Sequence, residues 1–328
     1  MADRQAGDDD HYAEAAAAFV RAVDDGSLEL PLPGGGATRR RWAMLSDLAE
    51  RDLSVGRLGE GHADAVAILA EMGEPAAGRG ERWGVWAAEP PSAGLSASSA
   101  PTGWRLTGRK RYCSGARVCT HALVTATADD GRRLFAVDLE QPGVRPLPGS
   151  WVAVGMAASD TLDVDFDAVA ATAVGPPGAY LARPGFWHGG IGVAACWYGG
   201  ACGLARTLLR AAADRDVGPY ALAHLGEIDV VQTAAAEALD AAAVEIDAEP
   251  DGSETTVRRR ALRVRAQIAA ACDLTLDRVG RALGAGPLSH DAAHARRAAD
   301  LSVYVRQHHA ERALAELGSL AAREGVRW

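Results

Sequence analysis

The residue types best suited to chemistry gather in one short stretch, GWRLTGRKRYCSGA at positions 103–116. Apolar residues and Gly108 predict a strand and a tight turn, after which one aromatic residue, Tyr112, is followed by Cys113 and Ser114. An aromatic ring beside small residues can cover a flat ligand that lies on the backbone. The same order of residues also occurs in an ordinary hairpin, so both interpretations stay open.

Histidines near the carboxyl end are the second chemical candidate. A neutral imidazole can accept a proton near neutral pH, and His308 and His309 are adjacent. The structural alternative is that one ring faces solvent and the other packs or caps a helix, because adjacent helical residues point to different faces. His290 and His294 are four residues apart, but no third ligand lies within reach by sequence. We therefore expect no metal site.

Composition excludes several classes of protein. With 48% hydrophobic and 23% charged residues, the 328-residue chain can build a sizeable core. A net charge of −9 argues against nucleic acid as the main partner. Five cysteines without a CxxC pair indicate reduced thiols in a cytoplasmic protein, and we expect no secretory signal. The apolar segment at 189–209 contains Arg206 and many glycines, which favours a buried helix over a membrane span.

Three blocks follow one another along the chain. Helical periodicity precedes a run of short, β-rich segments, which predicts a compact antiparallel sheet as a small barrel or sandwich. The sequence ADDGRRLFAV carries an Asp-Gly hairpin signal. Four long helices with short connections, roughly a four-helix bundle, are then expected at about 185–213, 219–247, 254–283 and 293–317. The predicted organisation is a disordered acidic tail at 1–10, a shortened helical domain at 11–78, a β domain at 79–183 and a helical bundle at 184–328.

Three motifs in this order resemble the acyl-CoA dehydrogenase family. AAEPPSAG at 87–94 stands where the family has Thr-Glu-Pro and a small-residue loop. The stretch at 103–116 stands where the family has Gly-x-x-Leu-x-Gly-x-Lys-x-Trp-Ile-Thr-Asn, and TLDVDFDAVAATAVG at 161–175 is similar to its closing strand. The resemblance implies an α+β fold with an N-terminal helical domain, a middle antiparallel β domain and a C-terminal four-helix bundle.

The same resemblance implies FAD, with FMN or a loosely bound reduced flavin as alternatives. Tyr112 would be the aromatic residue beside the ring and Ser114 the hydroxyl at its edge, with Ala88 at the position of the family's threonine. Arg215 lies near the family's position for an arginine that reaches the partner's cofactor, and Gly284 belongs to a Gly-rich loop near it. The complete set of candidate cofactor-binding residues is Trp86, Ala87, Ala88, Pro90, Ser92, Tyr112, Cys113, Ser114, Arg215 and Gly284.

One departure from the family concerns the catalytic base. Counting from Asp300, His308 stands where the family's glutamate is expected, and Glu311 lies three residues further on. A buried carboxylate suits removal of an α proton better than an imidazole does, because the imidazole becomes cationic. The leading hypothesis is a flavin-dependent oxidoreductase acting on an acyl-CoA, which is a CoA thioester, or on a related small substrate, with His308 as the acid/base. The alternatives are a monooxygenase of the same fold that uses His308, and a non-catalytic subunit of a heteromer; otherwise we expect a homodimer.

Overall fold

The computed structural model describes residues 2–89 and 94–324, with side chains from residue 10 to 323 outside that gap. The chain divides into two compact units, and the N-terminal helices are distributed between them. Each unit is described by itself. The first comprises Met1–Leu30, Arg57–Ala153 and Ala157–Phe186, and the second comprises Pro31–Gly56, Val154–Met156 and Trp187–Trp328.

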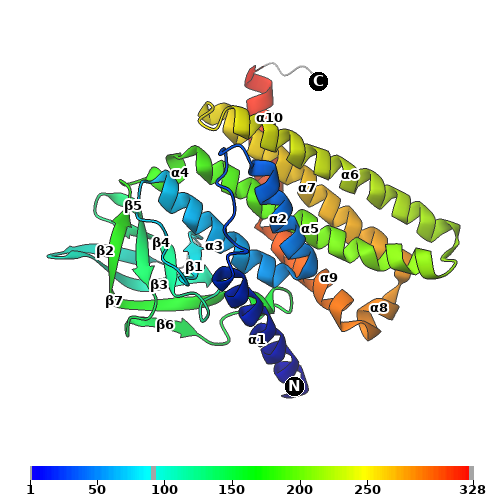
Figure 1. Ribbon diagram of the computed structural model, residues 1–328, viewed down its shortest axis with the longest axis horizontal. Helices are drawn as coiled ribbons and strands as arrows, with labels where there is room; N and C mark the ends of the chain where they lie inside the picture. Colours follow the sequence, from blue (N-terminus) through cyan, green and yellow to red (C-terminus); the bar gives the residue numbers. More distant parts are fainter. Residues whose placement is uncertain (1, 90–93, 325–328) are drawn as a thin grey trace. The chain divides into compact units, whose positions relative to one another are not determined.

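The first unit is built on a seven-stranded sheet in which β4, β2, β3, β7 and β5 form a closed circuit through the β4–β5 pairing (Figure 1). The expected antiparallel sheet holds for most strand pairs, but β1 and β2 each pair with β4 in parallel. The Asp-Gly hairpin is confirmed: β4 and β5 are antiparallel up to the pair Ala128 and Gly131. The strands are β1 (Trp83–Trp86), β2 (Leu95–Ala100), β3 (Gly103–Cys113), β4 (His121–Ala128), β5 (Gly131–Asp138), β6 (Val144–Leu147) and β7 (Leu162–Val174).

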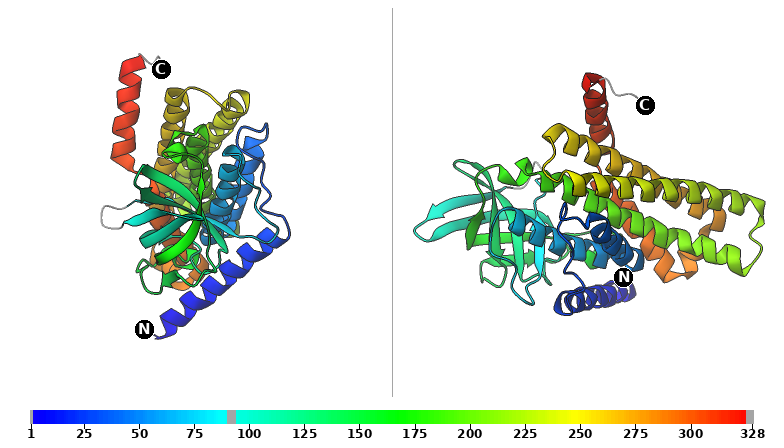
Figure 2. Two further views of the ribbon diagram at one scale, coloured as in Figure 1. Left: turned by 90° about the vertical axis from the view of Figure 1, so that its left-hand side faces the viewer. Right: turned by 45° about the horizontal axis from the view of Figure 1, so that its top comes forward.

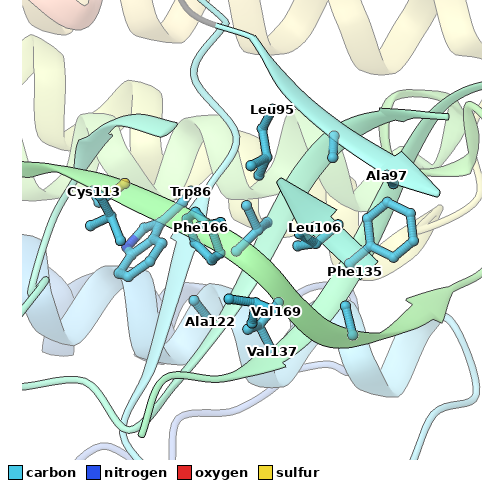
Figure 3. Close-up of a cluster of buried hydrophobic side chains, with 14 of the residues drawn as sticks. Trp86, Leu95, Ala97, Leu106, Cys113, Ala122, Phe135, Val137, Phe166 and Val169 are labelled. Carbon is cyan, nitrogen blue, oxygen red and sulfur yellow. The ribbon is translucent and has the colours of Figure 1, made fainter. Parts of the chain in front are cut away.

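Alternating residues of this sheet form the larger core of the first unit. Trp86 is 1% exposed and meets Phe166 edge to face, with ring centroids 6.4 Å apart. Figure 3 shows Leu106, Phe166 and Val169 pointing into the same cluster as Trp86 and Cys113. Two neighbouring strands, β3 and β7, therefore share one apolar inner face, as period-2 burial requires.

Helices complete the first unit. The backbone of helix α1 (Ala2–Asp24) is helical from residue 2. Alanine favours helix, and acidic residues toward the amino end suit the helix dipole. Arg117 links α1 to the segment that follows helix η1 (Ala157–Ser159): its guanidinium lies over the Tyr12 ring and binds Asp160. Helix α3 (Leu53–Glu71) enters this unit at Arg57, and α4 (Ala179–Ala182) follows β7.

The second unit is a helical bundle in which α5, α6 and α7 run side by side in alternating directions (Figures 1 and 2). The apolar stretch at 189–209 lies inside α5, as a buried helix. Close packing depends on Gly199, where an added Cβ would lie 2.1 Å from the Ser46 carbonyl oxygen on α2. The helices are α2 (Thr38–Arg51), α5 (Pro184–Asp214), α6 (Gly218–Ala248), α7 (Glu254–Leu283), α8 (Ala285–His290), α9 (Ala292–Tyr304), η2 (Val305–Gln307) and α10 (Ala310–Glu324).

The last predicted helix, at 293–317, is broken. Helix α9 ends at Tyr304, the 3₁₀ turn η2 follows, and His308 has extended backbone before α10 begins at Ala310. The β-branched valines and paired histidines here are weak helix formers, which explains the break. His308 and Glu311 therefore do not share a continuous helix. In the part of the chain that the structure describes, no helix has the length and apolar character needed to cross a membrane.

Candidate functional site

A β-bulge at the end of β3 turns Tyr112 outward. Along β3, Leu106 and Lys110 face inward at even positions, so regular alternation would also bury Tyr112. The register against β7 shifts between Lys110 and Cys113, and Cys113 takes the inward position instead. Tyr112 is consequently 49% exposed and has a φ of +61°, in the left-handed region that tyrosine rarely adopts. Backbone strain of this kind is concentrated at binding and catalytic sites.

Ser114 follows directly and is held by two hydrogen bonds. The Trp86 indole N–H donates to its carbonyl oxygen at 2.9 Å. Its hydroxyl lies 2.9 Å from the Thr161 hydroxyl, which in turn lies 2.8 Å from that of Ser159. Ser114 is only 8% exposed. The predicted flavin-edge hydroxyl is therefore a fixed member of a buried chain of three hydroxyl groups.

Two other predicted cofactor residues belong to the core. The Cys113 side chain is fully buried, and burial raises the pKa of its thiol well above the usual range despite the nearby Lys110 ammonium. Trp86 is equally enclosed (Figure 3). Only the backbone of Cys113 is available to a ligand at this surface. Trp86 contributes to the surface indirectly, because its indole N–H holds the Ser114 carbonyl in place.

An ion pair between the buried Lys110 and the more exposed Glu89 ties the companion loop to the sheet. The Lys110 ammonium donates to Glu89 Oε1 at 3.1 Å and to the Thr125 carbonyl and hydroxyl at 2.8 and 2.7 Å. Thr125 Oγ1 donates to the same Glu89 oxygen, and Arg132 pairs with the other at 2.9 Å. Burial lowers the pKa of Lys110 although Glu89 opposes the shift. Burial alone would raise the pKa of Glu89, but the Thr125 hydrogen bond and the Lys110 charge lower it.

This anchor fixes the start of the loop at 87–94. Ala87 is half-buried and Ala88 is exposed, so both present small side chains next to the anchored Glu89. Pro90 and Ser92 lie outside the described residues. An outward aromatic ring, a held serine and small loop residues are groups that a flat heterocycle can use, which makes this edge of the first unit a fitting surface for a flavin.

In the second unit, His308 lies against a buried tryptophan. The rings of His308 and Trp197 meet edge to face with centroids 6.2 Å apart and an angle of 64°. Tyr304 meets Trp197 at the same centroid distance and 88°. The Arg265 guanidinium lies 4.7 Å from the Trp197 ring centroid and donates to the Gly190 carbonyl. The break between α9 and α10 thus places an imidazole next to this aromatic group.

Its surroundings hold His308 neutral. Burial lowers the pKa of His308, and the positive charges of Arg265, His309 and Arg306 lower it further, while Asp273 raises it. Asp273 is itself ion-paired with Arg306. A histidine in this setting accepts a proton or a hydrogen bond at neutral pH.

The remaining predicted residues lie at junctions between helices of the bundle. Arg215 follows the end of α5 and is exposed. Gly284 joins α7 to α8 with a φ of +65° and is also exposed. The His294 ring is hydrogen-bonded to Thr207, 3.1 Å away, and His290 is exposed. Over residues 2–89 and 94–324, no group of three or more His, Cys, Asp or Glu residues is placed to hold a metal ion.

Sequence reasoning missed Trp197, Arg265 and the role of Glu89. Trp197 lies in the apolar segment that was interpreted only as a buried helix, and Arg265 lies in an arginine-rich stretch without a motif. Glu89 belongs to the loop motif at 87–94, but its partner Lys110 lies 21 residues away in the sequence. Pairings of this kind depend on strand register, which the sequence pattern left open.

No protein-family profile and no curated protein matches the chain. Solved structures do. Nitrososynthase from Micromonospora carbonacea var. africana is 21% identical over 97% of this chain and 95% of its own, with a TM-score of 0.79. Methanesulfinate monooxygenase MsuC from Pseudomonas fluorescens is 18% identical over 98% and 97%, with a TM-score of 0.78.

A third similar structure contains a flavin. KijD3 in complex with FMN and dTDP-3-amino-2,3,6-trideoxy-4-keto-3-methyl-D-glucose is 19% identical over 99% of this chain and 93% of its own, with a TM-score of 0.76. At this level of identity the likeness shows the fold. The chain has the acyl-CoA dehydrogenase-like fold, as its motifs indicated.

Proposed function

We propose that this protein is a flavin-dependent monooxygenase in which His308 handles the substrate's proton. The observation that carries the proposal is the neutral imidazole of His308 held against Trp197, at the place in the chain where a glutamate base was expected. The fold supports it, because MsuC, with a TM-score of 0.78, is a methanesulfinate monooxygenase.

The flavin would lie on the edge of the first unit that carries Tyr112. The half-exposed tyrosine ring would pack beside the heterocycle, and Ser114, fixed by Trp86 and Thr161, would offer its backbone and hydroxyl. Either FAD, as first expected, or FMN would fit these contacts. We favour FMN, because KijD3 binds it.

When bound and reduced, a flavin reacts with oxygen and supplies an oxygen atom for transfer to a substrate. The chain's own residues would orient the substrate and exclude water from the site. The unprotonated ring nitrogen of His308 would accept the substrate's proton or hydrogen bond, and Trp197 would keep the imidazole oriented by edge-to-face contact. The lowered pKa of His308 keeps that nitrogen available at neutral pH.

Dehydrogenation of an acyl-CoA is a weaker proposal. That reaction needs a base for an α proton, for which a buried carboxylate is suited. Glu311, the nearest carboxylate along the chain after His308, is exposed in the first turn of α10 and separated from His308 by the start of a new helix. Asp273, which acts electrostatically on His308, is engaged by Arg306.

The test couples the purified protein to a flavin reductase with NADH and a panel of small substrates. Oxygen-dependent product formation is expected, and a His308→Ala change should lower it by about 10²-fold. His309→Ala is the matched control and should keep activity, because His309 is exposed. Substrate oxidation that proceeds without oxygen, or full activity of His308→Ala, would refute the proposal. A protein that binds no flavin and copurifies with a homologous subunit would favour the non-catalytic alternative.

A further inference from the structure

We propose that Thr161 is a positioning residue whose hydroxyl lets Ser114 act either as a hydrogen-bond donor or as an acceptor toward the edge of a bound flavin. This inference rests on the proposed function in one respect: it takes the flavin to lie at the edge of the first unit that carries Tyr112. It goes beyond holding Ser114 in place, because it concerns how the site accommodates the oxidised and the reduced forms of one ligand.

Backbone hydrogen bonds hold the segment before β7 against the segment after β3. The N–H of Gly115 donates to the carbonyl of Ser159 at 2.8 Å. The N–H of Ala116 donates to the carbonyl of Asp160 at 3.2 Å. These two bonds set the position of Thr161, the next residue along the chain, without using its side chain.

Left-handed backbone occurs on both sides of this pairing. Tyr112, two residues before Ser114, has a φ of +61°. Asp160, directly before Thr161, has a φ of +49° and is 2% exposed, and its carboxylate accepts from the backbone N–H and the guanidinium of Arg117. Aspartate tolerates this region better than most residues, and such strain persists where the surrounding structure fixes it, often at binding sites. The fold therefore sets the geometry of the pair formed by Ser114 and Thr161.

The hydroxyl groups of Ser114, Thr161 and Ser159 form a chain that can run in either direction. Successive oxygen atoms lie 2.9 and 2.8 Å apart, and either atom of each pair can donate. A hydroxyl has one proton and two lone pairs, so Ser114 either accepts from Thr161 and donates outward, or donates to Thr161 and accepts from outside. Ser159 is 0% exposed and Ser114 is 8% exposed, so it is the Ser114 end that meets the surface.

This reversibility suits a ligand whose edge changes from acceptor to donor. Reduction of a flavin adds a proton to a ring nitrogen, and hydrogen bonds to the ring nitrogens tune the cofactor. With valine at position 161, Ser114 could still donate to an oxidised flavin. On accepting from a reduced flavin, however, its own proton would lose the partner that Thr161 provides. A buried donor without an acceptor is costly, so loss of the Thr161 hydroxyl should penalise the reduced form.

The experiment measures dissociation constants of oxidised and of dithionite-reduced FMN for the full-length, flavin-free protein by anaerobic calorimetry. Thr161→Val should weaken binding of reduced FMN about fivefold more than binding of oxidised FMN. Thr161→Ser, which keeps the hydroxyl, should restore the wild-type ratio of the two constants. The matched control is Thr172→Val, which removes an exposed threonine hydroxyl from β7 and should change neither constant. The ratio is the decisive readout, because a merely structural disturbance weakens binding of both forms alike.

A second substitution tests whether Thr161 acts through Ser114. In a Ser114→Ala background, Thr161→Val should no longer change the ratio, because the hydroxyl that it orients is gone. Thermal unfolding verifies that each variant is folded. If Thr161→Val does not fold, Thr161→Ala removes the same hydroxyl and takes its place.

Three results would overturn the inference: equal weakening of both FMN forms by Thr161→Val, a ratio that Thr161→Ser does not restore, or an effect of Thr161→Val that persists without the Ser114 hydroxyl. FMN binding with an unchanged ratio removes only the inference. A wild-type protein that binds neither form of FMN removes the flavin proposal and the inference together. The expected ratios without oxygen-dependent product formation support the inference and remove the monooxygenase proposal.

Discussion

The ion pair between Glu89 and the buried Lys110 gives the sharpest test of how the first unit is held together. We consider Glu89→Gln, which keeps size and hydrogen-bonding capacity but removes the negative charge. The Lys110 side chain is 5% exposed, and Arg132 is a second positive charge near it. After the substitution the ammonium keeps the two Thr125 oxygens but has no counter-ion.

Removing one partner of a buried ion pair costs about 3–5 kcal/mol. Because the Glu89 side chain is 26% exposed, solvent screening reduces this figure, and we expect a loss of about 2–3 kcal/mol in the free energy of unfolding at pH 7. The reverse change, Lys110→Met, should cost less, about 1–2 kcal/mol, because Glu89 keeps Thr125 and Arg132 as partners and remains partly solvated.

The pH dependence has a definite sign. The pKa of Lys110 is already lowered, and loss of Glu89 lowers it further. Between that lowered pKa and the ordinary value of lysine, the unfolded chain binds more protons than the folded one, so stability rises with pH. The deficit of Glu89→Gln relative to the wild type should therefore be largest at neutral pH and shrink toward pH 10.

Urea unfolding of the wild type and both variants at pH 7 and pH 9.5 measures this, with Glu140→Gln as the control for removing an exposed carboxylate from the same unit. A deficit that is independent of pH, or a Lys110→Met variant that is less stable than Glu89→Gln, would refute the reasoning.

Further predictions follow from glycine packing and from two histidines. Gly199→Ala should destabilise the protein by about 1–3 kcal/mol in urea unfolding, because the added Cβ would meet backbone of α2. Gly226→Ala is the control: its Cβ would have no atom within 4 Å, so the change should stabilise the protein by up to about 1 kcal/mol. Equal effects of the two changes would contradict the packing described for Gly199. Burial lowers the pKa of His62 to about 4, so stability should fall as the pH drops from about 6.5 toward 4, by up to about 3 kcal/mol, and His62→Gln should flatten this slope. The lowered pKa of His308 should place the acidic limb of the kcat/KM profile below pH 6.5. Arg265→Gln should move that limb to higher pH, because it removes a positive charge that lowers the pKa of His308. A limb that does not move would show that Arg265 does not tune the pKa of His308.

Much of the fold was accessible from sequence because its signals are local. Helical periodicity gave the long bundle helices, and the Asp-Gly pair gave the β4–β5 hairpin. One error also has a local cause. The apolar spacing of the last helix masked the weak helix formers that break it before His308.

The site was less accessible, because its geometry depends on contacts that are distant in sequence. Strict alternation along β3 would have buried Tyr112, and only the bulge against β7 turns it outward. The sequence pattern suggests a free Ser114 hydroxyl, yet it is hydrogen-bonded to Thr161, 47 residues away, which is in turn bonded to Ser159. The place of Trp197 beside His308 required the fold of the bundle.

The central claim is that a flavin binds at the edge of the first unit that carries Tyr112. The most direct measurement is an FMN titration, followed by quenching of FMN fluorescence, of the wild type and a Tyr112→Gly variant. Glycine tolerates the left-handed backbone at this position, so the variant should be at least as stable as the wild type while FMN binding weakens at least tenfold. A wild-type protein that binds neither FMN nor FAD, or a variant that binds FMN as tightly as the wild type, would contradict the account.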